Sequence, residues 1–80
     1  MADYFDRLAA LLTRHFDIDS EDIREGVALS SLGMDSLSLS EFGLLAGEEF
    51  GISLSEDILF IPGVTLGDIA RLIGKKAREG

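Results

Sequence analysis

The chain has 80 residues, a net charge of −8 and no cysteine. A chain of this length forms one small domain with a modest core, which leaves no room for a deep catalytic cleft. Its acidity disfavours binding to nucleic-acid phosphates and to anionic membrane surfaces, so we expect neither partner. Without cysteine the chain has no disulfide, no thiolate metal site and no thiol of its own. We also expect no membrane span and no signal peptide, because no apolar run is long enough and the first six residues lack a basic region.

The charge is concentrated in the middle of the chain. Residues 25–70 contain eight acids and no Lys or Arg, whereas acids and bases cancel in the remainder. Segregation of this kind indicates a surface that meets a basic partner. The simpler interpretation is a solvated acidic surface that keeps the protein in solution.

The first half of the chain predicts one long helix followed by a long loop. Apolar side chains repeat at helical spacing over residues 3–16. That stripe consists of Phe5, Leu8, Ala9, Leu12 and Phe16. Residues 17–35 show no long period, so their spaced apolar residues are expected to anchor a loop to the core, with one short turn at residues 20–23.

A second long helix is predicted to begin at Asp35 or Ser36 and to end at Gly51. Its core stripe contains Leu39, Phe42, Ala46 and Phe50, with Leu45 beside it. A second face combines apolar side chains with carboxylates, at Leu37, Glu41, Leu44 and Glu48. A third line holds only small residues, at Ser36, Ser40, Gly43 and Gly47. The two glycines indicate close approach of a neighbouring segment, or alternatively space for a bound chain.

Two further helices complete the predicted fold. Residues 53–56 are expected to cap a short helix that stops before Pro62. Thr65 and Asp68 form a capping signature for the last helix, whose core stripe includes Leu66, Ile69 and Ile73. We therefore predict an all-α fold, a small four-helix bundle with three long helices, one short helix and a long first loop.

One serine has the setting of a modification site. Ser36 follows Asp35 at the first turn of a predicted helix, where backbone N–H groups lack partners and the helix dipole is positive. A phosphate on this hydroxyl would be well placed, although a simple Asp or Ser cap explains the same residues.

The sequence Leu32-Gly33-Met34-Asp35-Ser36-Leu37 matches the L-G-x-D-S-L signature of acyl carrier proteins. The resemblance extends along the whole chain, through its length, acidity, long first loop, short third helix and capped last helix. We therefore expect residues 1–80 to form a single acyl carrier domain.

The resemblance implies a carrier and not an enzyme. Ser36 would be esterified with 4′-phosphopantetheine by a phosphopantetheinyl transferase that uses coenzyme A, with Asp35 contributing to recognition. The arm would carry acyl intermediates as thioesters to acyl-loading, condensing and tailoring enzymes with basic docking patches. Those partners would bind the face formed by Leu37, Glu41, Leu44 and Glu48. The resemblance further implies a cytoplasmic monomer without a metal of its own.

The pathway is suggested by departures from fatty-acid carriers. Ser38 and Gly47 stand where acids are frequent in such carriers, and the segment Ile58-Leu59-Phe60-Ile61 is more apolar than theirs. Met34 is common in polyketide carriers. These features favour polyketide or related secondary metabolism, with a fatty-acid carrier as the alternative. Aminoacyl and peptidyl carriers typically contain G-G-x-S, which this chain lacks.

Other classes of protein fit the sequence less well. An EF-hand starting at Asp17 would have Asp22 instead of Gly and Ala28 instead of Glu at key positions. Ser36 lacks the G-x-S-x-G context of a hydrolase nucleophile, and His15 is the single histidine. The remaining alternative of a different class is an acidic helical protein-interaction module without a prosthetic group.

Overall fold

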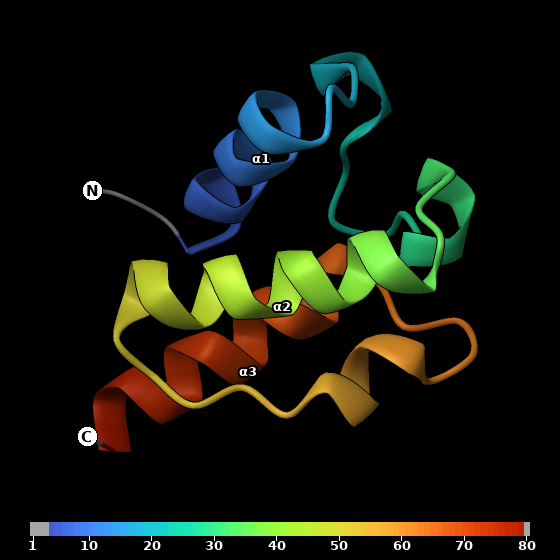
Figure 1. The fold of residues 1–80 in the computed structure, drawn as a ribbon. Coiled ribbons are helices and arrows are strands. Elements are labelled where there is room, and N and C mark those ends of the chain that lie inside the picture. Colours follow the sequence, from blue (N-terminus) through green and yellow to red (C-terminus); the bar gives the residue numbers. More distant parts are fainter. Residues whose placement is uncertain (1–3, 80) are drawn as a thin grey trace.

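The computed structural model describes residues 4–79, apart from the side chains of Glu56 and Glu79. Three α-helices, α1 (Tyr4–His15), α2 (Ser36–Phe50) and α3 (Leu66–Glu79), alternate with the 3₁₀ helices η1 (Ser20–Asp22), η2 (Leu29–Leu32) and η3 (Glu56–Phe60). Figure 1 shows α1 above α2, with α3 below it. The described residues form no strand, so the predicted all-α class is confirmed. The predicted start of the first helix at residue 3 lies outside the described residues. Among the described residues, no helix is both long and apolar enough to cross a membrane.

A single apolar core joins the three helices to η2 and η3. Its buried members are Leu8, Leu11, Leu12, Leu29, Leu39, Phe42, Ala46, Leu59, Leu66, Ile69, Ala70 and Ile73. The rings of Phe16 and Phe42 meet edge to face, with their centroids 6.1 Å apart. Each large apolar side chain removed from water contributes about 1.5–3 kcal/mol, so this core is the main source of stability. The predicted stripes of α1, α2 and α3 supply most of it.

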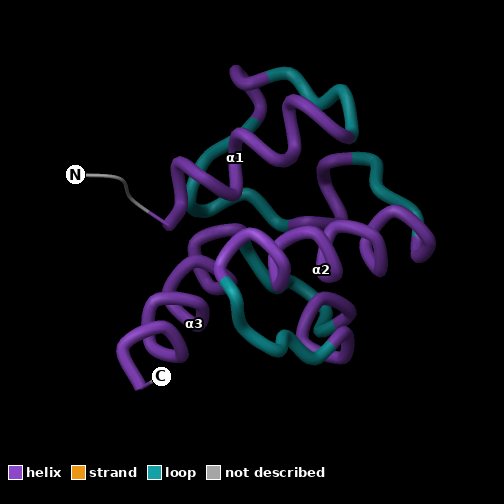
Figure 2. The backbone as a smooth tube through the Cα atoms, turned by 60° about the vertical axis from the view of Figure 1, so that its left-hand side comes forward, coloured by secondary structure: helices purple, strands orange, loops and turns teal. Residues whose placement is uncertain are grey.

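The long first loop is held against the start of α3. Backbone hydrogen bonds join Leu29 N to Val64 O at 3.0 Å and Leu66 N to Val27 O at 3.1 Å, around an isolated antiparallel bridge between Ala28 and Thr65. Figure 2 shows this connection as a long, mostly teal segment between α1 and α2. The predicted turn at residues 20–23 is confirmed by η1, whereas η2 was not predicted because four residues carry no periodic signal.

Two predicted helix ends, at Gly51 and at Thr65, follow the capping chemistry. Gly51 ends α2 in the left-handed conformation, at φ 66°, which glycine adopts without steric cost. At α3, Thr65 N donates to Asp68 Oδ2 and Asp68 N donates to Thr65 Oγ1, both at 3.1 Å. The predicted side-chain cap of the third helix is wrong. Ser55 precedes η3 without a side-chain capping bond, and η3 is a 3₁₀ helix held in place by the buried side chain of Leu59.

Candidate functional site

The start of α2 is organised by Asp35. Its carboxylate Oδ1 accepts a hydrogen bond from Ser38 N at 2.8 Å, and its carbonyl oxygen accepts the first helical bond, from Leu39 N at 2.9 Å. The amide and the hydroxyl of Ser38 hold the pKa of the Asp35 carboxyl below its ordinary value. Asp35 is therefore the N-cap, as predicted, and remains ionised around neutral pH.

Ser36 is the first helical residue of α2, and its side chain is exposed. Its hydroxyl makes no hydrogen bond to the residues that the structure describes. The backbone N–H groups of Ser36 and Leu37 precede the first helical hydrogen bond, and the first turn of α2 contains no acidic side chain. A hydroxyl in this setting is accessible to another protein, and the helix start favours a phosphate at its oxygen. These residues therefore fit a phosphate-linked group.

The predicted mixed face of α2 is exposed over its whole length. Leu37 is 74% exposed and Leu44 is 64% exposed, which is unusual for large apolar side chains, and Glu41 and Glu48 are also exposed. The two leucines are seven residues apart, so they lie on the same side of the helix two turns from each other. This face contains an apolar pair flanked by carboxylates, and it begins directly beside Ser36.

Glu49, the neighbour of this face, has a structural role. Its side chain is exposed, yet it forms an ion pair with the first helix. Glu49 Oε2 lies 2.7 Å from Arg7 Nη2 and 3.2 Å from Arg7 Nε, so the pair joins α1 to α2. Sequence reasoning missed this contact because the two residues are 42 positions apart. Asp68 also has a structural role, because its carboxylate caps α3 and forms an ion pair with Arg71.

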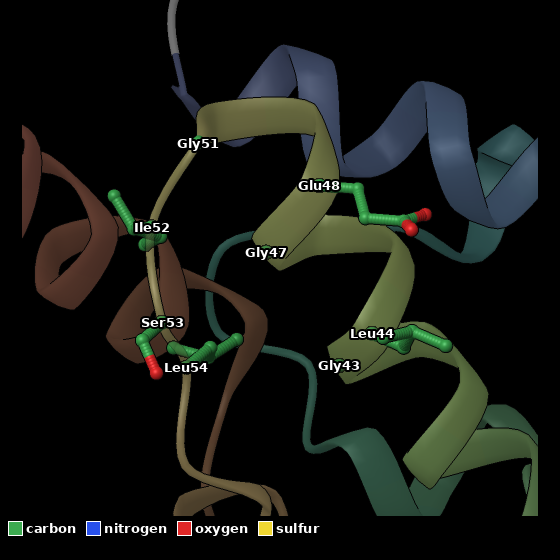
Figure 3. A pocket seen from close by; sticks show the side chains of 8 residues that line it. All are labelled: Gly43, Leu44, Gly47, Glu48, Gly51, Ile52, Ser53 and Leu54. Atoms are coloured by element: carbon green, nitrogen blue, oxygen red, sulfur yellow. The ribbon is translucent and has the colours of Figure 1, made fainter.

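A shallow groove of about 550 Å³ runs between α2 and the segment that follows it. Figure 3 shows Gly43 and Gly47 on the helix opposite Ile52 and Leu54, with Leu44 and Glu48 directed to the other side. A Cβ on Gly43 would lie 2.7 Å from Cδ1 of Leu59, and one on Gly47 would lie 2.9 Å from the carbonyl oxygen of Ile52. Close approach of η3 and of the residue 51–54 segment therefore accounts for both glycines.

Comparison with known proteins identifies the class of this chain. Residues 6–73 match the family model described as a phosphopantetheine attachment site. An acyl carrier protein of Sinorhizobium fredii (strain NBRC 101917 / NGR234) is 32% identical over 76 residues, which cover 94% of this chain and 96% of the relative. The acyl carrier protein AcpP of Rhizobium meliloti (strain 1021) has the same identity and coverage.

The helical fold and the family match define a phosphopantetheine-bearing carrier, not a catalyst. The chain belongs to the acyl carrier protein family, and its cofactor is covalently bound 4′-phosphopantetheine. Membership implies interaction with a phosphopantetheinyl transferase and with enzymes that handle acyl groups.

Proposed function

We propose that Ser36 is the residue to which 4′-phosphopantetheine is attached, and that residues 1–80 act as one acyl carrier domain. The observation that carries this proposal is the position of Ser36, whose exposed hydroxyl stands at the first residue of α2 directly after its N-cap. Asp35 supports the site by fixing where the helix begins, so that the hydroxyl and the first backbone amides are presented together. We also assign Asp35 to transferase recognition, because its carboxylate is exposed beside the modified oxygen.

The chain contributes position and charge, and the cofactor contributes the reactive group. When bound, 4′-phosphopantetheine supplies a terminal thiol that holds acyl groups as thioesters, whereas the polypeptide has no cysteine. Ser36 Oγ would hold the phosphate, and the N–H groups of Ser36 and Leu37 would favour its negative charge.

The exposed face of α2 is the proposed binding surface for partner enzymes. Leu37 and Leu44 would enter apolar depressions on a partner, while Glu41 and Glu48 would pair with basic residues around them. Two observations support this surface. Leu37 and Leu44 are large apolar side chains that are exposed, and the neighbouring carboxylates of Glu41 and Glu48 make no ion pair with the described residues. Such contacts are weak and sensitive to salt, as a carrier that moves between enzymes requires. The chain would act as a monomer in the cytoplasm, beside these enzymes.

Polyketide or related secondary metabolism is the proposed pathway, with fatty-acid synthesis as the alternative. Exposed apolar side chains near the attachment site favour the polyketide pathway. Phe60 and Ile61 are 43% and 52% exposed. They line a small hollow together with Leu39, which lies one helical turn after Ser36. The partners would then be acyl-loading, condensing and tailoring enzymes of such a pathway.

Intact-mass spectrometry tests the attachment residue. The chain is incubated with coenzyme A, magnesium and a broad-specificity phosphopantetheinyl transferase. The wild type should gain the mass of one phosphopantetheine, and the Ser36→Ala variant should gain none. The matched control is Ser31→Ala, which removes another exposed serine and should gain one phosphopantetheine, as the wild type does. A gain that persists in Ser36→Ala would assign the cofactor to a different residue. No gain on the wild type, with an active transferase control, would favour an unmodified interaction module.

The pathway is tested with the loaded carrier. The loaded carrier should transfer its acyl group faster to a condensing enzyme of polyketide type than to one of fatty-acid type. Equal rates, or a preference for the fatty-acid enzyme, would contradict the proposed pathway without affecting the attachment site.

A further inference from the structure

A second surface, remote from Ser36, has the opposite charge to the face of α2. A groove of about 430 Å³ runs between the start of α1 and the outer side of α3. Tyr4 and Phe5 line it from α1, while Arg71, Lys75 and Arg78 line it from α3. The three cations are spaced four and three residues apart, so they follow one edge of the helix.

Small residues contribute to the lining of this groove. Gly67, Ala70 and Gly74 line it from α3, and a Cβ on Gly74 would lie 3.4 Å from the Tyr4 ring. The aromatic wall, formed by Tyr4 and Phe5, therefore comes close to α3 at Gly74, and the three basic residues of α3 also line the groove. The lining of the groove therefore combines two aromatic side chains with three cationic ones.

The charge balance of the groove is positive, in contrast to the molecule as a whole. Arg71 pairs with Asp68, whereas Lys75 and Arg78 form no ion pair with the described residues. Glu25 is the single acid among the described residues that line the groove. Three of the seven basic residues of the chain are thus gathered at a site outside the acidic α2 face. Clustering of this kind favours an acidic partner.

We infer that this groove binds an acidic segment of a partner protein, in which two or three carboxylates flank an aliphatic or aromatic side chain. The carboxylates would pair with Lys75, Arg78 and Arg71, and the apolar side chain would contact the aromatic wall. A short peptide fits better than a membrane or a nucleic acid, because an extended anionic surface would also meet the acidic remainder of a molecule whose net charge is −8.

The groove lies far enough from the start of α2 for a partner to bind at both places at once. Figure 1 shows that α2 begins on the side of the molecule opposite the start of α1 and the end of α3. A partner segment in the groove would therefore leave Ser36 and the exposed face of α2 accessible. Tethering at one end while the other end is in use raises the local concentration of the carrier near its enzymes.

The test uses the full chain labelled with ¹⁵N and a blocked eight-residue peptide containing four glutamates around one leucine. Amide shifts should change at Gly67 and Gly74 and not along the exposed face of α2, and the binding should weaken as salt is added. The combined substitutions Arg71→Gln, Lys75→Gln and Arg78→Gln should lower the association constant about fivefold or more. The matched control Arg14→Gln, Arg24→Gln and Lys76→Gln removes the same net charge outside the groove and should bind nearly as the wild type does.

Three results would overturn the inference. The first is an equal loss of binding in both triple variants, which would show non-specific attraction. The second is equal binding of a peptide in which glutamines replace the glutamates. The third is binding of phosphatidylglycerol vesicles or a single-stranded oligonucleotide at the groove without binding of the peptide. Circular dichroism checks that each variant is folded, and Ser36→Ala should bind the peptide unchanged, so that this test is independent of the attachment site.

Discussion

Arg7 and Glu49 join the first helix to the end of the second through two contacts to one carboxylate and one to a carbonyl. Arg7 Nη2 lies 2.7 Å from Glu49 Oε2 and also donates to the Glu49 carbonyl oxygen at 3.2 Å. The guanidinium carbon lies 4.5 Å from the centroid of the Phe50 ring, which in turn contacts Tyr4 at 5.5 Å between centroids. One arginine thus pairs with an acid, caps a helix end and covers an aromatic ring.

This arrangement predicts unequal costs for the two partners. Glu49→Gln should lower the free energy of unfolding by about 0.5 kcal/mol, because the pair is partly exposed and screened. Arg7→Ala should cost about 1–2 kcal/mol, since it also removes the carbonyl contact and the cation–π contact. Urea denaturation measures both. Glu48→Gln is the matched control, because this exposed acid has no ion-pair partner among the described residues. An equal loss in Glu48→Gln and Glu49→Gln would contradict the specific role of Glu49.

The two helical glycines should respond differently to alanine. Alanine gains about 1 kcal/mol of helix propensity at either position. At Gly47 the new methyl would meet the carbonyl oxygen of Ile52 at 2.9 Å, and this backbone cannot move cheaply, so Gly47→Ala should be destabilising by about 1–2 kcal/mol net.

At Gly43 the methyl would meet the terminal carbon Cδ1 of Leu59 at 2.7 Å, a side-chain atom that a small rotation can move within the core, so Gly43→Ala should be within about 1 kcal/mol of the wild type. Thermal and urea denaturation of both variants check the difference, and Gly26→Ala, where nothing lies within 4 Å, serves as the control. A Gly47→Ala variant more stable than Gly43→Ala would show that the loop carbonyl yields more readily than the core leucine.

The capping chemistry at α3 predicts a dependence of stability on pH. The amide and then the hydroxyl of Thr65, with a smaller contribution from Arg71, hold the pKa of Asp68 below its ordinary value. A carboxyl with a lowered pKa in the folded state stabilises the fold above its pKa in the unfolded chain, about 3.9, and this contribution is lost as the pH falls through the lower folded value.

The free energy of unfolding should therefore decrease as the pH falls below about 4, and less steeply in Asp68→Asn. Urea denaturation from pH 6 to pH 3 measures the slope, with Asp57→Asn as the comparison, because Asp57 is exposed and its side chain makes no hydrogen bond or ion pair with the described residues. If Asp68→Asn and Asp57→Asn change the slope equally, the cap does not control this behaviour.

The features that were predictable from sequence are those set by neighbouring residues. The Asp35 cap, the Gly51 end of α2 and the Thr65–Asp68 box each depend on contacts within a few positions, which is why the sequence pattern identifies them. The Arg7–Glu49 pair and the contact of Gly43 with Leu59 depend on how helices cross after they fold. Short 3₁₀ helices such as η2 and η3 are fixed by tertiary packing around Leu29 and Leu59, so capping rules apply to them poorly.

The exposed leucines of α2 make the sharpest prediction about partners. Leu44→Ala should leave the free energy of unfolding nearly unchanged, because its side chain is already 64% exposed. It should nevertheless lower kcat/KM for modification by a phosphopantetheinyl transferase, or for acyl transfer to a condensing enzyme, by about fivefold to tenfold if the leucine is a buried anchor in the complex. Glu41→Gln and Glu48→Gln together should lower the same rate mainly at low salt, since their attraction to a basic partner is screened at high salt.

The matched controls for this last experiment lie away from the α2 face. Glu21→Gln and Asp22→Asn remove the same net charge from η1, where both acids are exposed, and should leave the transfer rate nearly unchanged. Rates are measured at two salt concentrations with each variant at equal loading, so that a defect in modification is not mistaken for one in docking. If the η1 variant loses as much rate as the Glu41 and Glu48 variant, overall charge controls encounter and α2 has no special role. If Leu44→Ala transfers at the wild-type rate with every enzyme, the apolar pair does not anchor these partners, and its exposure requires another explanation.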